Sequence, residues 1–552
     1  MCQGEAEITK KSNIILLADC TDTLTMIKNV GPYKIACRLR KAGYEVHVIH
    51  HLHTFTYQEL EYLLQSIVNN DTLMIGVNNF FYQGLNISVK QDDGVELSHK
   101  ELGSFIPHGK YYNKKLRDLI AKINPNTKWV LGGPDATDSE YNKDFDYVVL
   151  GYGDDSIVNL ANHLDHNEKL IKTFRSLNHF TVVNDARAEN YNFTSDVMQY
   201  RIDDCILNHE TLVIEISRGC IFRCKFCSYP LNGKQKFDYI KEKEILVHEF
   251  TDNFNKFGVT RYIFSDDTVN DSVEKCMLLQ DIARSLPFKL EWWGYIRLDL
   301  LTRFPETISM LYNSGWRAGF FGIETLDSAT SKRIGKGGDR NRLIDTLKKL
   351  KQDYGDTIGL HGSFIFGLPH ESIDSMELTR KFLMSKDNPL DSWQANPMRI
   401  RSKRSNTSLS FDSGFISDID LNSQNYGYND ITNQQTKDIQ DLYKGIMIWQ
   451  NEHTDWLSMV NYCDQLLEQG TEINARSTGN RRAFEIAGLG LPLAHTLNKN
   501  LGEVDWYEID KIKLNRANQY KKLIWQKFNL TLLPVEPCTT FSDFLRYKYF
   551  KN

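Results

Sequence analysis

The chain has 552 residues, enough for two or three domains, and its 41% hydrophobic and 25% charged residues are an ordinary globular composition. Its net charge of -5 excludes a general electrostatic attraction to nucleic acid or to an anionic membrane, although it does not exclude local basic patches. No apolar run approaches the roughly 20 residues that span a bilayer, and residues 1–11 lack the apolar core of a signal peptide. We therefore expect a soluble, cytoplasmic protein without a membrane partner.

The first 165 residues alternate strand-like and helix-like segments, and this βαβα order predicts a parallel, doubly wound sheet of the Rossmann-like type. The expected strands cover residues 13–18, 45–49, 72–77, 128–131 and 147–150. The expected helices cover residues 32–41, 57–67 and 116–123. Residues 85–113 are polar and interrupt the pattern, so we expect an inserted loop or hairpin there.

Residues 166–208 are expected to be a linker, and a second βα series occupies residues 209–400. Its six units predict a partial (β/α)6 barrel that is open on one side. The expected strands lie near residues 212–216, 262–264, 290–295, 318–323, 359–366 and 393–400, with helices at 240–250, 273–283, 306–313, 342–350 and 376–383. Residues 401–552 begin with a polar, loop-like stretch and are expected to form a mainly helical C-terminal region.

Three cysteines lie in one short run, at Cys220, Cys224 and Cys227. An odd number cannot pair completely as disulfides, and three thiolates at this spacing suit a [4Fe–4S] cluster whose fourth iron stays open. The run follows the predicted strand at 212–216, so the thiolates would lie at the carboxyl edge of the barrel, where α/β folds place their chemistry. A zinc site completed by a distant ligand and a cluster that only transfers electrons are the alternatives.

The cysteine run resembles the cluster motif of the radical S-adenosylmethionine (SAM) superfamily, in which an aromatic residue, here Phe226, precedes the last cysteine. The resemblance implies that Cys220, Cys224 and Cys227 hold the cluster, that SAM binds to its open iron, and that Phe226 lies beside the cofactor. Reductive cleavage of SAM would then produce a 5′-deoxyadenosyl radical that acts on an unactivated carbon. It also implies an electron donor such as flavodoxin or ferredoxin.

The resemblance continues at the ends of the following strands and implies contacts with SAM. Asp266, or Asp267 as the second choice, would bind the methionyl ammonium by charge-assisted hydrogen bonds. The fork of Arg297 suits a carboxylate, Glu324 would bind the ribose hydroxyls or the ammonium, and Ser363 would contact the adenosine. The alternatives are a helix N-cap for the aspartates and ion pairs with neighbouring residues for Arg297 and Glu324.

The N-terminal segment resembles the cobalamin-binding module of many radical SAM enzymes, and glycines at strand ends carry much of that likeness. Such glycines let a ligand approach the backbone closely. They are Gly132, Gly133, Gly151 and Gly153. The DxHxxG signature of cobalamin mutases is absent, so no histidine is marked as a cobalt ligand. Cobalamin is therefore a candidate second cofactor, and a domain kept for packing or substrate capture is the alternative.

These motifs lead to three functional hypotheses. The first is a cobalamin-dependent radical SAM methyltransferase whose C-terminal region, 401–552, covers the barrel mouth and selects the substrate. The second is a radical SAM cyclase, rearrangement or oxidation enzyme without methyl transfer. The third is a non-catalytic iron–sulfur protein that binds nucleic acid or a partner through arginine clusters, which the near-neutral net charge disfavours. No motif specifies the substrate, which is a small molecule or a biopolymer.

Overall fold

The computed structural model describes most of the two predicted βα regions and two C-terminal helices. The described residues are 12–18, 27–55, 57–78, 109–132, 145–151, 153–170, 173–175, 181–185, 193–222, 224, 226–227, 238–368, 371–401, 446–448, 453–454, 456–473 and 506–531. The chain divides into two compact units. The first comprises Met1–Tyr191, Met198–Leu207 and Asp510–Asn552, and the second comprises Asn192–Val197 and Asn208–Ile509.

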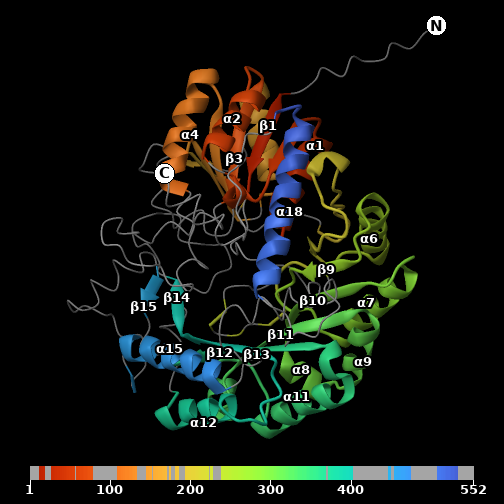
Figure 1. Ribbon diagram of the computed structural model, residues 1–552, viewed down its shortest axis with the longest axis vertical. Coiled ribbons are helices and arrows are strands. Elements are labelled where there is room, and N and C mark those ends of the chain that lie inside the picture. The colour runs from red at the N-terminus through yellow and green to blue at the C-terminus, as the bar shows by residue number, and fades with distance from the viewer. Residues whose placement is uncertain are drawn as a thin grey trace. The chain divides into compact units, whose positions relative to one another are not determined.

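The first unit contains a doubly wound, mainly parallel sheet (Figure 1). Its described strands are β1 (Asn13–Leu17), β2 (Glu45–Ile49), β3 (Thr72–Asn78), β4 (Lys128–Gly132), β5 (Tyr147–Gly151), β6 (Thr173–Arg175) and β7 (Thr181–Asp185). They lie in the order β2-β1-β3-β4-β5-β7-β6. Every residue of β1 is buried, as expected for a central parallel strand that helices cover on both faces. The fold class predicted for this region is confirmed.

Helices of the first unit pack in two pairs, α1 with α5 and α2 with α4, as in a sheet covered on both faces. They are α1 (Val30–Lys41), α2 (Tyr57–Ile67), α4 (Gly109–Ile123) and α5 (Ser156–His166). Because α4 begins at Gly109, the end of the segment 85–113 is helical rather than loop. The preceding residues 79–108 lie outside the described residues.

Residues 166–208 differ from the predicted linker, because β6 and β7 lie within them. β7 pairs in parallel with β5, and β6 pairs antiparallel with β7. Both strands are short, and Thr-Phe-Arg and Thr-Val-Val-Asn-Asp carry too little hydrophobic alternation to stand out in the sequence. Their pairing with β5 extends the first sheet beyond residue 165.

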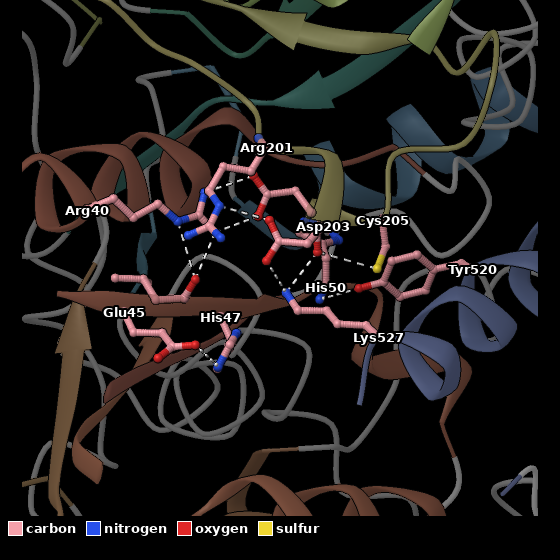
Figure 2. A network of polar contacts seen from close by, with 11 residues as sticks. Arg40, Glu45, His47, His50, Arg201, Asp203, Cys205, Tyr520 and Lys527 are labelled. Atoms are coloured by element: carbon pink, nitrogen blue, oxygen red, sulfur yellow. Dashed lines mark hydrogen bonds and ion pairs between the residues drawn. The ribbon is translucent and has the colours of Figure 1, made fainter. Parts of the chain in front are cut away.

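A C-terminal helix, α18 (Trp506–Lys527), completes the first unit from Asp510 onward. The backbone N–H of His50 donates a hydrogen bond of 2.8 Å to the Tyr520 hydroxyl, and Lys527 forms an ion pair of 3.4 Å with Asp203 (Figure 2). Lys521 of α18 also pairs with Glu59 of α2. Its Nζ lies 2.6 Å from Glu59 Oε1, and both side chains are only 3% exposed. The end of the chain, which the sequence assigned to a separate C-terminal region, therefore packs with the N-terminal sheet.

The second unit contains a parallel sheet of six described strands in sequential order, β13-β12-β11-β10-β9-β8, as expected for a partial barrel. The strands are β8 (Leu212–Ile214), β9 (Arg261–Phe264), β10 (Glu291–Ile296), β11 (Trp316–Glu324), β12 (Gly359–Phe366) and β13 (Ser392–Pro397). Helices alternate with them: α6 (Lys243–Phe257), α7 (Val273–Ser285), α8 (Leu298–Arg303), α9 (Glu306–Asn313), α10 (Ser328–Arg333), α11 (Arg340–Tyr354) and α12 (Ile373–Leu383). The barrel prediction is confirmed.

Beyond the barrel, residues 399–401 form β14 (Arg399–Arg401), which pairs antiparallel with β15 (Ile446–Ile448) instead of extending β13. Helix α15 (Trp456–Ile473) packs on β13 within the second unit. Its Tyr462 hydroxyl donates a hydrogen bond of 3.1 Å to Glu377 on α12. None of the described helices is both long and apolar enough to cross a membrane.

Candidate active site

The three cysteines follow β8 on a loop at the carboxyl edge of the second sheet. Cys220 and Cys224 are buried, Cys227 is half-buried, and all three are free thiols. The Cys227 N–H donates a hydrogen bond of 2.9 Å to the Cys224 carbonyl, which gives the loop a local turn. The sequence placed the thiols at this edge, and the structure has them there.

The surroundings of the thiols fit a cluster ligand set. Thr268 Oγ1, in the loop after β9, lies 3.5 Å from Cys220 Sγ, and Arg297 Nη1, directly after β10, lies 3.2 Å from Cys224 Sγ. Burial raises the pKa of the Cys220 thiol, and the contact with Thr268 opposes this rise. Among the described residues, no group of three or more His, Cys, Asp or Glu side chains is arranged to hold a single metal ion. The fit of a cluster therefore rests on three thiols, two of which have a hydroxyl or a guanidinium within hydrogen-bond distance.

Asp266, the first choice for binding the SAM ammonium, is committed to a buried network. It accepts hydrogen bonds from the Ser217 hydroxyl and from the Ile216 N–H (3.1 Å), and forms an ion pair of 2.9 Å with Lys275 of α7. Burial lowers the pKa of Lys275, but Asp266 and Asp271 more than compensate, so the ammonium stays charged. Asp266 thus ties the lead-in of the cysteine loop to α7.

The neighbouring Asp267 has a different environment. It is half-buried, and burial, followed by repulsion from Asp266, raises its pKa to about 7. A carboxyl with a raised pKa beside a cluster loop is one that a bound cation would stabilise in its ionised form. Asp267 thus differs from Asp266, whose carboxylate is already paired with Lys275.

Arg297 is held from several sides at the end of β10. Its Nε and Nη2 donate to both carboxylate oxygens of Asp299, at 3.0 and 2.7 Å. Asn270 exchanges two hydrogen bonds with its backbone, at 2.8 and 2.9 Å. The guanidinium carbon also lies 4.0 Å from the ring centroid of Phe222, a residue of the cysteine loop. The ion pair considered as an alternative is present, and it leaves Nη1 directed at Cys224.

Glu324 ends β11 and pairs with Lys336 at 3.0 Å, so the alternative of an ion pair is also present here. Its φ of 67° lies in the left-handed region, which is costly for a residue with a side chain and is common at functional sites. A Cβ at Gly322 would lie 2.7 Å from the Glu324 carboxylate and 2.9 Å from Lys336 Nζ. Glycine at this position therefore lets the pair lie against the strand.

The remaining predicted residues are spread over both units. Ser363 is buried on β12 and accepts a hydrogen bond of 3.0 Å from Gln394, and Phe226 is half-buried in the cysteine loop. In the first unit, Gly132 ends β4 with open space where a Cβ would be, whereas Gly153 has Val149 and Ile35 within 3.5 Å of that position. Gly151 ends β5, and Gly133 lies outside the described residues.

Sequence reasoning missed several residues that organise this edge of the sheet. They are Thr268, Asn270, Lys275 and Glu371. Glu371 is buried after β12 and accepts hydrogen bonds from the Gly367 and Leu368 N–H groups, at 3.0 and 3.2 Å, and from the Thr325 hydroxyl at 3.0 Å. Thr325 directly follows Glu324, so Glu371 joins the ends of β11 and β12. Its acidic side chain four residues after a turn glycine was the available signal.

The second unit is thus a partial βα barrel with three free cysteines on the loop after its first strand. Residues 214–383 match the radical SAM superfamily, so this part of the chain is a radical SAM domain. The family implies a [4Fe–4S] cluster and SAM as cofactors.

Two curated relatives are similar to this chain. One is an uncharacterized methyltransferase of Pyrococcus horikoshii, 28% identical over 178 residues, or 32% of this chain and 37% of the relative. The other is bacteriochlorophyllide d C-12(1)-methyltransferase of Chlorobaculum tepidum, 26% identical over 182 residues, or 32% of this chain and 38% of the relative. The chain thus spans less than half the length of these relatives.

The fold is also similar to that of a solved structure of the cobalamin-dependent S-adenosylmethionine radical enzyme OxsB. The TM-score is 0.51 at 13% identity, and the match covers 98% of this chain and 84% of OxsB. At this identity the likeness concerns the fold. It extends over both the N-terminal sheet and the radical SAM sheet.

Proposed function

We propose that this protein is a cobalamin-dependent radical SAM methyltransferase. The observation that carries the proposal is the coexistence of two units in one chain. One is a doubly wound sheet with open space at the end of a strand, and the other is a radical SAM sheet with three free cysteines. The similarity to two methyltransferases supports methyl transfer, and the similarity of the fold to cobalamin-dependent OxsB supports cobalamin.

The N-terminal sheet supplies a suitable edge for a second cofactor. Its first strands follow the order β2-β1-β3-β4-β5, in which the winding direction reverses between β1 and β3. Ligands of open α/β sheets bind outside the carboxyl ends of the strands near such a reversal. The open space beside Gly132 lies at the carboxyl end of β4, next to β3. This edge is where we propose that cobalamin binds.

When bound, the cluster and SAM would supply a 5′-deoxyadenosyl radical, and cobalamin would supply the methyl group. The chain's own residues would orient these groups. Cys220, Cys224 and Cys227 would hold the cluster, and Asp267 would accept hydrogen bonds from the methionyl ammonium. Asp266 acts through Ser217 and Ile216, whose positions set the start of the cysteine loop. An electron donor such as flavodoxin or ferredoxin would reduce the cluster.

Anaerobic reconstitution with iron and sulfide tests the radical SAM part of the proposal. With SAM and a reductant, the wild-type protein should form 5′-deoxyadenosine and methionine. Cys224→Ala should lose most of its iron and form neither product. Formation of both products by this variant at the wild-type rate would contradict the cluster assignment.

Cobalamin binding is tested separately by loading with hydroxocobalamin, gel filtration and absorbance. Gly132→Leu fills the open space at the end of β4 and should lower cobalamin retention while iron content stays unchanged. Cys224→Ala should show the reverse pattern, with cobalamin kept and iron lost. If the wild-type protein retains no cobalamin, the cofactor assignment fails, and cyclisation or rearrangement without methyl transfer becomes the better hypothesis.

A further inference from the structure

Arg297 donates a side-chain hydrogen bond to the sulfur of the second cysteine in the cysteine loop. Its Nη1 lies 3.2 Å from Cys224 Sγ, within the 4.0 Å reach of a hydrogen bond to sulfur, and both residues are buried. A guanidinium cannot lose its charge in proteins, so this contact places a permanent positive charge beside the Cys224 sulfur.

The direction of this contact is set by the surrounding residues. Asp299 occupies Nε and Nη2 of Arg297, and the Phe222 ring covers the face of the guanidinium at 4.0 Å. Asn270 holds the backbone of the same residue by two hydrogen bonds. Of the three guanidinium nitrogens, Asp299 leaves Nη1, which faces Cys224. The arginine is therefore oriented before any cofactor binds.

We propose that Arg297 tunes the cluster by donating a hydrogen bond from Nη1 to the Cys224 thiolate. The inference rests on the proposed cluster at the three cysteines and differs from the sequence-based expectation that Arg297 binds a SAM carboxylate. Hydrogen bonds to cluster sulfurs and nearby positive charge stabilise the reduced, more negative cluster, and so raise its reduction potential. Arg297 is then a positioning residue that eases reduction of the cluster.

The contacts also link this tuning to the shape of the loop. Phe222 and Cys224 lie two residues apart in the cysteine loop, and Arg297 contacts both. Arg297 thus fixes the loop between its first and second cysteines to the end of β10. Lysine does not reproduce this arrangement, because an ammonium is a point charge without a planar fork to bind Asp299 and Cys224 together.

The test is a redox titration of reconstituted protein, followed by electron paramagnetic resonance without SAM. In Arg297→Gln, the ratio of reduced to oxidised cluster at a fixed applied potential should fall about tenfold, which corresponds to about 59 mV for one electron. The matched control is Arg303→Gln, which removes the same charge from an exposed residue six positions further along the chain. Its ratio should stay within threefold of the wild type.

The outcomes separate this inference from the proposed function. A wild-type protein that assembles no cluster would overturn both. A cluster in the wild type with an unchanged ratio in Arg297→Gln would overturn the role of Arg297 alone. If Arg297→Gln does not retain iron, the same redox titration is made on Arg297→Lys, which keeps the charge. A lower ratio in that variant supports the inference, and a wild-type ratio overturns it.

Discussion

The buried ion pair between Lys521 and Glu59 makes a quantitative prediction about α18. The two charged atoms are 2.6 Å apart, both side chains are 3% exposed, and Lys521 also donates to the Thr54 carbonyl at 3.3 Å. Removing one partner of a buried pair leaves an uncompensated charge and costs about 3–5 kcal/mol. Lys521→Met should therefore weaken the docking of α18 on the first unit by about this amount.

Amide hydrogen exchange measured by mass spectrometry on peptides from residues 514–527 reads this docking directly. A loss of about 3–5 kcal/mol corresponds to exchange that is faster by roughly 150- to 4,000-fold, because about 1.4 kcal/mol equals a factor of ten. Lys522→Met is the matched control, since Lys522 is exposed on the same helix, and it should leave exchange unchanged. Less than a fivefold change in Lys521→Met, or an equal change in the control, would refute the reasoning.

Three further predictions concern the barrel. Burial lowers the pKa of His361 to about 3, so the unfolded chain, with a pKa near 6.5, binds its proton first as the pH falls. The free energy of unfolding should therefore decrease by about 2 kcal/mol from pH 7.5 to pH 5. Urea unfolding should show this decrease in the wild type and in the control His248→Gln, which changes an exposed histidine. His361→Gln should not show it. Asp267→Asn should weaken SAM binding in equilibrium dialysis by about tenfold and leave the melting temperature unchanged. Asp266→Asn should lower the melting temperature. The opposite pattern would count against Asp267 as the residue that binds the SAM ammonium. Glu371→Ala removes the acceptor of two N–H hydrogen bonds and should cost about 2–4 kcal/mol in urea unfolding, more than Glu371→Gln, which keeps an acceptor oxygen.

The choice between the two aspartates shows where a sequence signal existed and was not used. Phe264 is buried and stacks on Trp292 at 4.5 Å, on the face of the sheet that α6 covers, with Phe250 at 6.3 Å. Residues two apart along an extended chain point to the same side. Asp266 shares the side of Phe264 and meets Lys275 on α7, so the period-two pattern already indicated a structural role for it.

The ion pairs of Arg297 and Glu324 differ in how far the sequence predicts the partner residue. Asp299, the partner of Arg297, lies two residues on in α8, and a neighbouring partner of this kind is one of the alternatives that the sequence indicates. Lys336, the partner of Glu324, belongs to a loop whose course the sequence does not reveal. Lys336 reaches Glu324 because Gly322 leaves room beside the strand, and Glu324 itself has a φ of 67°. Backbone conformations of this kind follow from surrounding contacts and not from local preference.

By itself, the sequence determined both βα regions, their parallel sheets and the position of the three cysteines at a strand end. The periodic pattern of apolar residues and the spacing of the cysteines are local properties of the sequence. Both can therefore be recognised without the tertiary structure. Only the tertiary structure placed α18 with the N-terminal sheet, through Lys521 and Glu59, and directed Arg297 toward Cys224. These pairings join residues far apart along the chain, and packing selects them from many partners of equal charge.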